Sequence, residues 1–181
     1  MVKRVKSMAK LEVEFGWCRG YDEAIHLSQI FADNVTSSYI SHAELQGLRA
    51  LDPSTWSPNI RAVLAADLTS RINQPLDAHD GERTKLLACG RIRNEYVAVF
   101  LVGFSRAAAV AYTEIEDMVV VSAARDGGVG HAFLEWVAEQ SRQRGIKRIF
   151  LESGVRNARA HKFFEETGFH QVSMVMMKSL Q

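Results

Sequence analysis

The sequence has few cysteines, no long apolar run and almost no net charge, and each of these limits what the protein can be. Its two cysteines, Cys18 and Cys89, form no CxxC or Cys/His spacing, which argues against a disulfide framework and a zinc site and suits a reducing cytosol. No apolar run reaches the roughly 18–20 residues that a membrane-spanning helix requires. The 22 Lys and Arg residues nearly balance the 21 Asp and Glu residues, for a net charge of +1, so no overall field favours nucleic acid or a membrane surface.

A chain of 181 residues is long enough to bury a substantial core and suggests one domain. Residues 1–10 are basic, but no apolar region follows them, so we expect a flexible lead-in rather than a secretory signal. The single domain is then expected over residues 11–181, in the cytoplasm.

Hydrophobic periodicity predicts an alternation of strands and helices. Strands are expected at 11–17, 84–92, 95–104, 112–121, 146–152 and 169–178. Helices are expected at 22–34, 39–51, 60–72, from Gly130 to about Gly145, and at 157–167, with a loop at 51–59 that exposes Trp56. The methionines Met174, Met176 and Met177 are expected to fill core space on the last strand. Antiparallel strands precede a β-α-β unit, so the sequence predicts an α/β domain with a mixed central sheet flanked by helices.

The stretch from Tyr112 to Ala132 predicts an anion-binding site. An apolar strand is followed by Arg125-Asp126-Gly127-Gly128-Val129-Gly130 and then by an amphipathic helical pattern. The amides of a first helical turn have no intrahelical acceptor, and the helix dipole favours negative charge at this end. Glycines let a phosphate approach the backbone closely, so we expect a pyrophosphate to bind here.

Two motifs are separated by one predicted helix and one predicted strand. The first is Arg125-x-x-Gly128-x-Gly130, and the second is Asn157-x-x-Ala160-x-x-Phe163-Phe164-x-x-x-Gly168-Phe169. In both motifs and in their separation the sequence resembles the GCN5-related N-acetyltransferase (GNAT) family, whose acetyl-CoA signature is [Q/R]-x-x-G-x-[G/A]. The resemblance extends from about Thr84 to the C-terminus, and before it only the order of elements is similar.

The resemblance implies a single-domain GNAT fold whose sheet splays apart where acetyl-CoA binds. It implies that the amides of Gly127 to Gly130 hold the pyrophosphate and that Arg125 shapes the turn. It also implies that the backbone of Met118 to Val121 pairs with the pantetheine arm and polarises the thioester carbonyl. The cofactor-binding residues expected from the two motifs and the strand are Met118, Val119, Val120, Val121, Arg125, Asp126, Gly127, Gly128, Val129, Gly130, Asn157, Ala160, Phe163 and Phe164.

Acetyl transfer to an amine requires a base, because a primary amine is mostly protonated at pH 7 (a model lysine pKa is about 10.4). Strict alternation predicts two faces of the strand, one with Glu114, Glu116, Met118 and Val120 and the other with Ile115, Asp117, Val119 and Val121. By resemblance Glu114 matches the catalytic glutamate of the family's histone acetyltransferases, and Glu116 lies closer to the thioester. Repulsion between the two carboxylates could raise one pKa and produce the base. Alternatively, both carboxylates only attract a cationic substrate or pair with surface Lys and Arg.

Phe164 departs from the family pattern, which often places a tyrosine there to protonate the leaving thiolate. Another group could supply the proton, such as Tyr112, a water or a residue on the N-terminal loops. The thiolate could also leave unassisted, since a thiol pKa near 8.5 makes this inexpensive. A different class of function stays open as well, a non-catalytic acyl-CoA-binding or regulatory domain.

The acceptor cannot be identified from the sequence beyond its charge. Glu114, Glu116 and Asp117 favour a cationic amine on a small molecule or a peptide. The resemblance places the acceptor near the N-terminal helices, so Tyr39 and Trp56 are expected to line its pocket, with Tyr112 as a third candidate. No metal, nucleic acid or membrane partner is expected, and edge strands leave a homodimer open.

Overall fold

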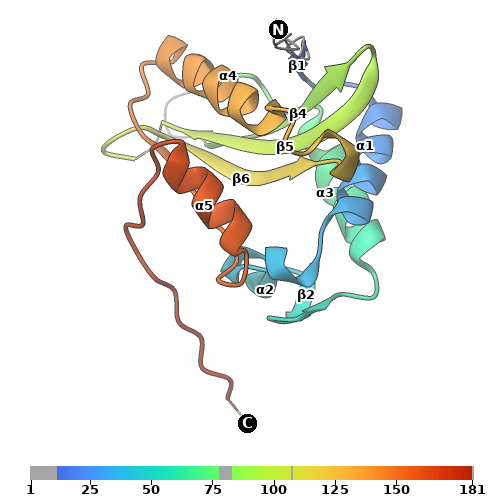
Figure 1. The fold of residues 1–181 in the computed structure, drawn as a ribbon, viewed down its shortest axis with the longest axis vertical. Coiled ribbons are helices and arrows are strands. Elements are labelled where there is room, and N and C mark those ends of the chain that lie inside the picture. Colours follow the sequence, from blue (N-terminus) through green and yellow to red (C-terminus); the bar gives the residue numbers. More distant parts are fainter. Residues whose placement is uncertain (1–11, 78–82, 107, 181) are drawn as a thin grey trace, which may run out of the picture.

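A five-stranded mixed sheet forms the centre of the protein (Figure 1). The computed structural model describes residues 12–77, 83–106 and 108–180, so the expected lead-in at 1–10 lies outside the described residues. The strand order is β1-β4-β5-β6-β7, and only the β6–β7 pair is parallel. The strands are β1 (Glu14–Trp17), β4 (Arg83–Ile92), β5 (Glu95–Ser105), β6 (Tyr112–Val120) and β7 (Ile149–Leu151). The predicted α/β class and mixed sheet are confirmed.

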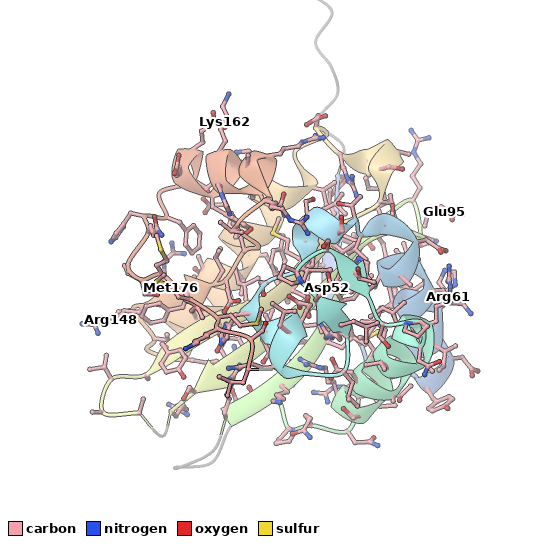
Figure 2. All side chains as sticks on the ribbon, turned by 90° about the horizontal axis from the view of Figure 1, so that it is seen from below. Asp52, Arg61, Glu95, Arg148, Lys162 and Met176 are labelled. Carbon is pink, nitrogen blue, oxygen red and sulfur yellow. The ribbon has the colours of Figure 1, made fainter. Side chains whose placement is uncertain are left out.

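Helices cover both faces of the sheet. Helices α1 (Tyr21–Asn34) and α3 (Ile60–Arg71) pack on one face through Phe31 and Leu64. Helix α4 (Val129–Gln143) packs on the other, where the ring of Phe133 stacks on Phe100 with the centroids 3.6 Å apart. Helix α5 (Ala158–Glu166) packs on this second cluster through its phenylalanines, while Lys162 projects away from the molecule (Figure 2).

The predicted hairpin between β4 and β5 forms as expected. Arg93 and Asn94 connect the strands with φ values of 51° and 66°, the left-handed conformation that a two-residue hairpin turn requires. The ten paired positions of this hairpin make it the longest ladder of the described sheet, and β6 extends it by a further antiparallel pairing.

The predicted helix at 39–51 is wrong. The chain forms the 3-10 turn η1 (Ser37–Tyr39), the short helix α2 (His42–Gln46), and a hairpin of β2 (Ala50–Asp52) and β3 (Thr55–Trp56). Ser41 and Glu44 form a capping box that starts α2, which ends at Gly47. Asp52 accepts a 2.7 Å hydrogen bond from the Ser54 amide and so closes the hairpin turn. The predicted loop at 51–59 is therefore partly a hairpin, and Trp56 is half-buried rather than exposed.

The predicted last strand, at 169–178, is also wrong. Residues 170–180 follow α5 as an extended segment without secondary structure and lead away from the sheet toward the C-terminus (Figure 1). The methionines expected in the core are exposed, Met176 by 88%. A strand requires a neighbour for its backbone hydrogen bonds, and no described strand of the same chain provides one here. None of the described helices combines the length and the apolar character that a bilayer span requires.

Candidate active site

A β-bulge in β6 determines which side chains face the candidate site. Leu101 of β5 pairs with Asp117 and Val102 pairs with Ile115, so Glu116 is an extra residue in the ladder. The bulge shifts the alternation by one position. Ile115 and Met118 therefore both contribute to the α4 side of the core, whereas Val119 joins the α1–α3 side. The predicted shared face of Glu114, Glu116, Met118 and Val120 is wrong for this reason, because strict alternation assumes an unbroken ladder.

A cleft opens where β6 and β7 separate. The two strands pair only from Thr113 to Ile115 with Ile149 to Leu151, although β6 continues to Val120. The cleft has a volume of about 50 Å³. Its lining residues include Tyr39, Glu116, Asp117, Met118, Asn157 and Phe164. The structure thus brings residues of β6, α5 and the N-terminal turn η1 to one place.

The glycine turn leads into α4, whose residue Gly130 packs against the cleft residue Met118. Asp126 and Gly128 adopt left-handed conformations, with φ values of 64° and 83°, and Val129 begins the helix. An added Cβ at Gly128 would have no heavy atom within 4 Å, so glycine is favoured here for its left-handed φ and not for lack of space. Gly130 is required for packing, because an added Cβ would lie 2.9 Å from Cε of Met118 and 3.0 Å from Cζ of Phe163. The Asp126 carboxylate faces outward and pairs with Arg159 at 2.7 Å.

Arg125 ties the turn to the end of β6 and to α1. Its Nε donates to the Val120 carbonyl at 3.0 Å, and its Nη2 donates to the Asn34 carbonyl at 2.7 Å. The Asn34 side chain accepts in turn from the Ser122 amide of the 3-10 turn η2 (Ser122–Ala124) at 3.0 Å. Gly127 and Val121 are held by backbone bonds to Ala124 and Val97. The contacts of Arg125 are those of a residue that shapes the turn.

The second motif forms the wall of the cleft opposite β6. The Asn157 side chain accepts from the Ala160 amide at 3.4 Å and caps the start of α5. Asn157, Ala160 and Phe164 line the cleft, whereas Phe163 packs against Gly130 instead. Phe164 also packs on Phe169, with the ring centroids 5.8 Å apart.

Three arginines bind the carboxylates of β6: Arg71 and Arg83 bind the two glutamates, and Arg49 binds Asp117. Nη2 of Arg83 lies 2.8 Å from Glu114 and 2.7 Å from Glu116, and Nη2 of Arg71 lies 2.8 Å from the other oxygen of Glu116. Gly103 leaves room for this pairing, because an added Cβ would lie 3.0 Å from Nε of Arg83. The Arg83 guanidinium, shared by the two carboxylates, offsets the electrostatic repulsion between them. Of the two, only Glu116 lines the cleft.

Asp117 is the carboxylate on this strand whose pKa is raised. Burial raises the pKa of Asp117 to about 6, although Arg49 at 2.8 Å favours the charged form. The Tyr39 hydroxyl donates to Asp117 at 2.9 Å and accepts from the Met118 amide at 3.1 Å. Burial together with the Asp117 charge raises the pKa of Tyr39. Burial lowers the pKa of Arg49, but Asp117 and Asp67 more than offset it, so this guanidinium stays charged.

The raised pKa of Asp117 makes a testable contribution to stability. Its pKa is about 6 in the folded protein and 3.8 as the model value, so the folded state favours the protonated form. This contribution is fully present below pH 3.8 and is lost as the pH rises through about 6. The difference of about two pKa units between the folded and unfolded states corresponds to at most about 3 kcal/mol of the free energy of unfolding.

We therefore expect wild type to lose stability relative to Asp117→Asn as the pH rises from about 4 to 6, and the difference to be constant above that range. Urea unfolding of both proteins from pH 4 to 8 measures this. A difference that stays flat through pH 4–6 would contradict the assignment.

Two of the three predicted acceptor residues lie together and the third lies elsewhere. Tyr39 lines the cleft, and the ring of Trp56 lies 6.3 Å from it. The Trp56 indole N–H is buried without a hydrogen-bond partner among the described residues. Tyr112 lies at the opposite end of β6, where its ring packs on Phe150 with the centroids 5.5 Å apart. It is not among the residues that line the cleft.

The loop after β7 holds the η1–α2 region against the sheet. The Glu152 carboxylate accepts from the amides of His42 and Ala43, at 2.8 and 3.2 Å, and bonds the His42 ring. Gly154 is buried so closely that an added Cβ would lie 2.5 Å from the Ile40 carbonyl and 2.6 Å from that of Ser38. This contact positions Tyr39 at the cleft.

The sequence predictions missed Arg49, Arg71, Arg83 and Glu152, which complete the polar network. Arg49 and Arg71 lie in the predicted helices 39–51 and 60–72, and Arg83 directly precedes a predicted strand, all places where an arginine is ordinary. For Asp117 the sequence predicts only a negative charge that favours a cationic acceptor. Its position between the apolar residues Ile115 and Val119 along the strand is a usable signal, because a carboxylate buried there needs partners.

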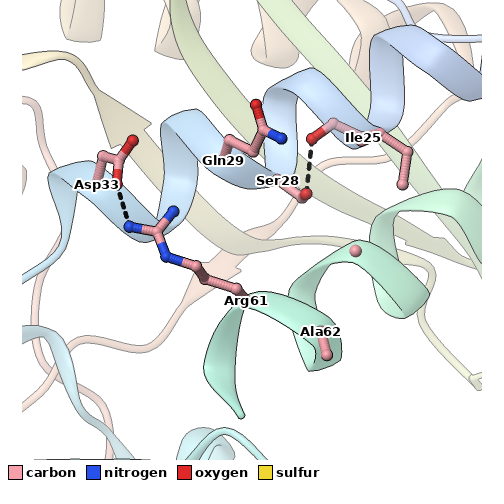
Figure 3. A pocket seen from close by; sticks show the side chains of 7 residues that line it. Ile25, Ser28, Gln29, Asp33, Arg61 and Ala62 are labelled. Atoms are coloured by element: carbon pink, nitrogen blue, oxygen red, sulfur yellow. Dashed lines mark hydrogen bonds and ion pairs between the residues drawn. The ribbon is translucent and has the colours of Figure 1, made fainter. Parts of the chain in front are cut away.

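Two other features lie apart from the cleft. A hollow of about 400 Å³ lies between α1 and α3, where Arg61 and Asp33 pair at 2.5 Å, and none of the predicted site residues lines it (Figure 3). Ligand atoms of Cys18, Glu23 and Cys89 lie within 4.8 Å of one another, the one metal-compatible group among the described residues. Arg91 and Tyr96 already bond the Glu23 carboxylate.

Comparison with known proteins decides the family. A sequence profile of the Acetyltransferase (GNAT) family matches residues 50–169. The chain belongs to this family. An aminoalkylphosphonate N-acetyltransferase of Salmonella typhimurium is 30% identical over 67 residues, which are 37% of this chain and 44% of that enzyme. The chain thus matches less than half the length of that relative.

Solved structures agree with the GNAT fold. A transcriptional regulator from Bacillus halodurans is similar with a TM-score of 0.65 at 17% identity, over 93% of this chain and all of that one. An aminoglycoside acetyltransferase from an uncultured soil metagenomic sample, in complex with trehalose, is similar with a TM-score of 0.60 at 13% identity, over 95% and 97% of the two chains. At these identities the likeness concerns the fold alone.

Proposed function

We propose that this GNAT protein transfers an acetyl group from acetyl-CoA to a primary amine on a small molecule. The observation that carries the proposal is the continuity of the site. Glu116 and Met118 of β6 line one cleft, and Cε of Met118 lies 2.9 Å from where a Cβ of Gly130, in the first turn of α4, would be. The curated relative at 30% identity is named for an aminoalkylphosphonate acceptor, which supports a small-molecule amine.

The residues present fit acetyl-CoA, which supplies an activated thioester when it is bound. Gly128, with its left-handed φ of 83° and open surroundings, leaves space for a pyrophosphate beside the first amides of α4. Met118 and Val120 direct backbone groups away from β5, and these would pair with the pantetheine arm. In this structure the Met118 amide donates to Tyr39, so Tyr39 would exchange that bond for another when the arm binds.

Glu116 is the proposed base. The group of carboxylates around it is proposed to attract the acceptor. Glu116 lines the cleft, and an ionised carboxylate can accept the proton that an ammonium must lose. Around it, five carboxylates face three arginines, a formal excess of two negative charges. They are Glu44, Asp67, Glu114, Glu116 and Asp117, with Arg49, Arg71 and Arg83. This excess favours a cationic acceptor.

A specific observation supports a second candidate, a non-catalytic acyl-CoA-binding or regulatory domain. Both carboxylate oxygens of Glu116 are already paired with guanidinium groups, and Phe164 brings no proton donor to the cleft. For the catalytic candidate, the Tyr39 hydroxyl is the proposed source of the thiolate proton in place of Tyr112, because Tyr39 lines the same cleft.

Coenzyme A release with a panel of small amines, polyamines, aminoglycosides and peptide N-termini distinguishes the two candidates. We expect release above slow hydrolysis with at least one small amine. We also expect acetyl-CoA to stabilise the protein by about 2.7 kcal/mol at a hundredfold its Kd. Stabilisation by acetyl-CoA without release across the panel would favour the binding domain. The absence of both stabilisation and release would contradict both candidates. The reducing cytosol stays the predicted compartment.

A further inference from the structure

The segment 171–177, which follows α5, has the character of a strand without a partner. Its sequence, QVSMVMM, is mostly apolar, and the large apolar side chains are strongly exposed. The exposed fractions are 67% for Val172, 77% for Met174, 58% for Val175, 88% for Met176 and 61% for Met177. Alternation places Val172, Met174 and Met176 on one face and Val175 and Met177 on the other. A strand that is apolar on both faces is typical of one covered on both sides.

The outer edge of β7 is the matching open site. β7 is the last strand of the described sheet, with β6 on one side and no strand on the other. The Arg148 carbonyl accepts from the Thr113 amide of β6 at 2.9 Å, so the backbone groups of Ile149 and Leu151 turn toward the open edge. An unpaired edge of this kind readily accepts another strand.

Apolar side chains flank this edge on both faces of the sheet. On one face Ile149 and Leu151 are half-buried beside the phenylalanines of α5. On the other face Phe150 is 40% exposed and packs on Tyr112. A strand added here would therefore cover apolar surface on both of its faces, as the composition of segment 171–177 requires.

We propose that segment 171–177 adds as an outer strand to the edge of β7 in a second copy of this chain, and that the exchange is reciprocal. Phe169 anchors the end of α5 on Phe164, and beyond it the chain leads away from its own sheet (Figure 1). Each chain carries one unpaired segment and one open edge. A two-fold symmetric pair therefore satisfies both, and the exchange closes at two chains.

Sedimentation equilibrium of the full chain tests the proposal directly. Wild type is expected to be a dimer at micromolar concentration. The variant Met174→Glu/Val175→Glu, which places one charge on each face of the segment, is expected to raise the dimer dissociation constant by at least about tenfold. The control variant Leu48→Glu/Val155→Glu changes two residues that are 79% and 87% exposed outside the segment and is expected to leave the constant unchanged. A monomeric wild type, or equal effects of both variants, would overturn the proposal.

Cross-linking identifies which chain receives the segment. A chain with Phe150→Cys is mixed with a longer, tagged chain that carries Ser173→Cys, Val175→Cys or Met177→Cys in turn, and the mixture is oxidised with glutathione disulfide. The native cysteines are buried, with exposed fractions of 1% and 3%. Disulfides between the short and long chains are the expected result. A chain carrying both substitutions that forms only internal disulfides while sedimenting as a monomer would show that the segment covers its own β7.

Discussion

Replacing Glu116 with glutamine should lower the rate of acetyl transfer by about 10²- to 10⁴-fold, the range that a positioned general base contributes. Glutamine keeps the size of the side chain and an oxygen that can accept from Arg71, which bonds Glu116 at 2.8 Å. It cannot take the proton that the acceptor's ammonium must lose before the amine attacks the thioester. The rate of coenzyme A release at saturating amine measures the loss, and thermal unfolding with and without acetyl-CoA shows that cofactor binding is retained.

The matched control is Glu114→Gln. Glu114 lies on the same strand and pairs with the same Arg83, at 2.8 Å, but does not line the cleft. We expect a much smaller loss of rate for this variant, because it perturbs the arginine network without touching the reacting groups. Equal losses for the two variants would mean that the network only attracts the acceptor. A larger loss for Glu114→Gln would transfer the proposed role of base to that residue.

Replacing Gly154 with alanine should destabilise the protein by about 3 kcal/mol, near the upper end of what overpacking usually costs. The added Cβ would lie 2.5 and 2.6 Å from two backbone carbonyl oxygens, those of Ile40 and Ser38. Backbone cannot move aside as a flexible side chain can. The displaced turn carries Tyr39, so we also expect weaker acetyl-CoA binding and slower transfer. Urea unfolding at pH 7 measures the stability.

Gly16→Ala is the control for that substitution. Gly16 lies in β1, has a φ outside the left-handed region, and has no heavy atom within 4 Å of an added Cβ. Alanine there should leave stability unchanged or raise it by up to about 1 kcal/mol, since glycine in a strand costs conformational entropy. A Gly154→Ala protein as stable as wild type would contradict the described contact between the β7–α5 loop and η1.

Local patterns in the sequence determined the parts of this fold that depend on neighbouring residues. The predicted helices at 22–34 and 60–72 and the strands at 84–92 and 95–104 differ from the structure by at most one residue at each end. The glycine turn and the Asn157 cap also lie in one short stretch of chain each. Apolar periodicity, turn residues and caps act over a few positions, so a single sequence contains the information that sets them.

The tertiary structure decided what depends on residues far apart in the chain. The bulge at Glu116 arises from the pairing of β5 with β6, and it separates Met118 from the face of Glu114. The partners of Asp117 come from residues 39 and 49, in a region where the predicted helix was wrong. Segment 171–177 has the pattern of a strand, but a strand exists only where another strand bonds it. Register, buried charge pairs and strand partners are set by contacts across the fold, which periodicity along the chain does not record.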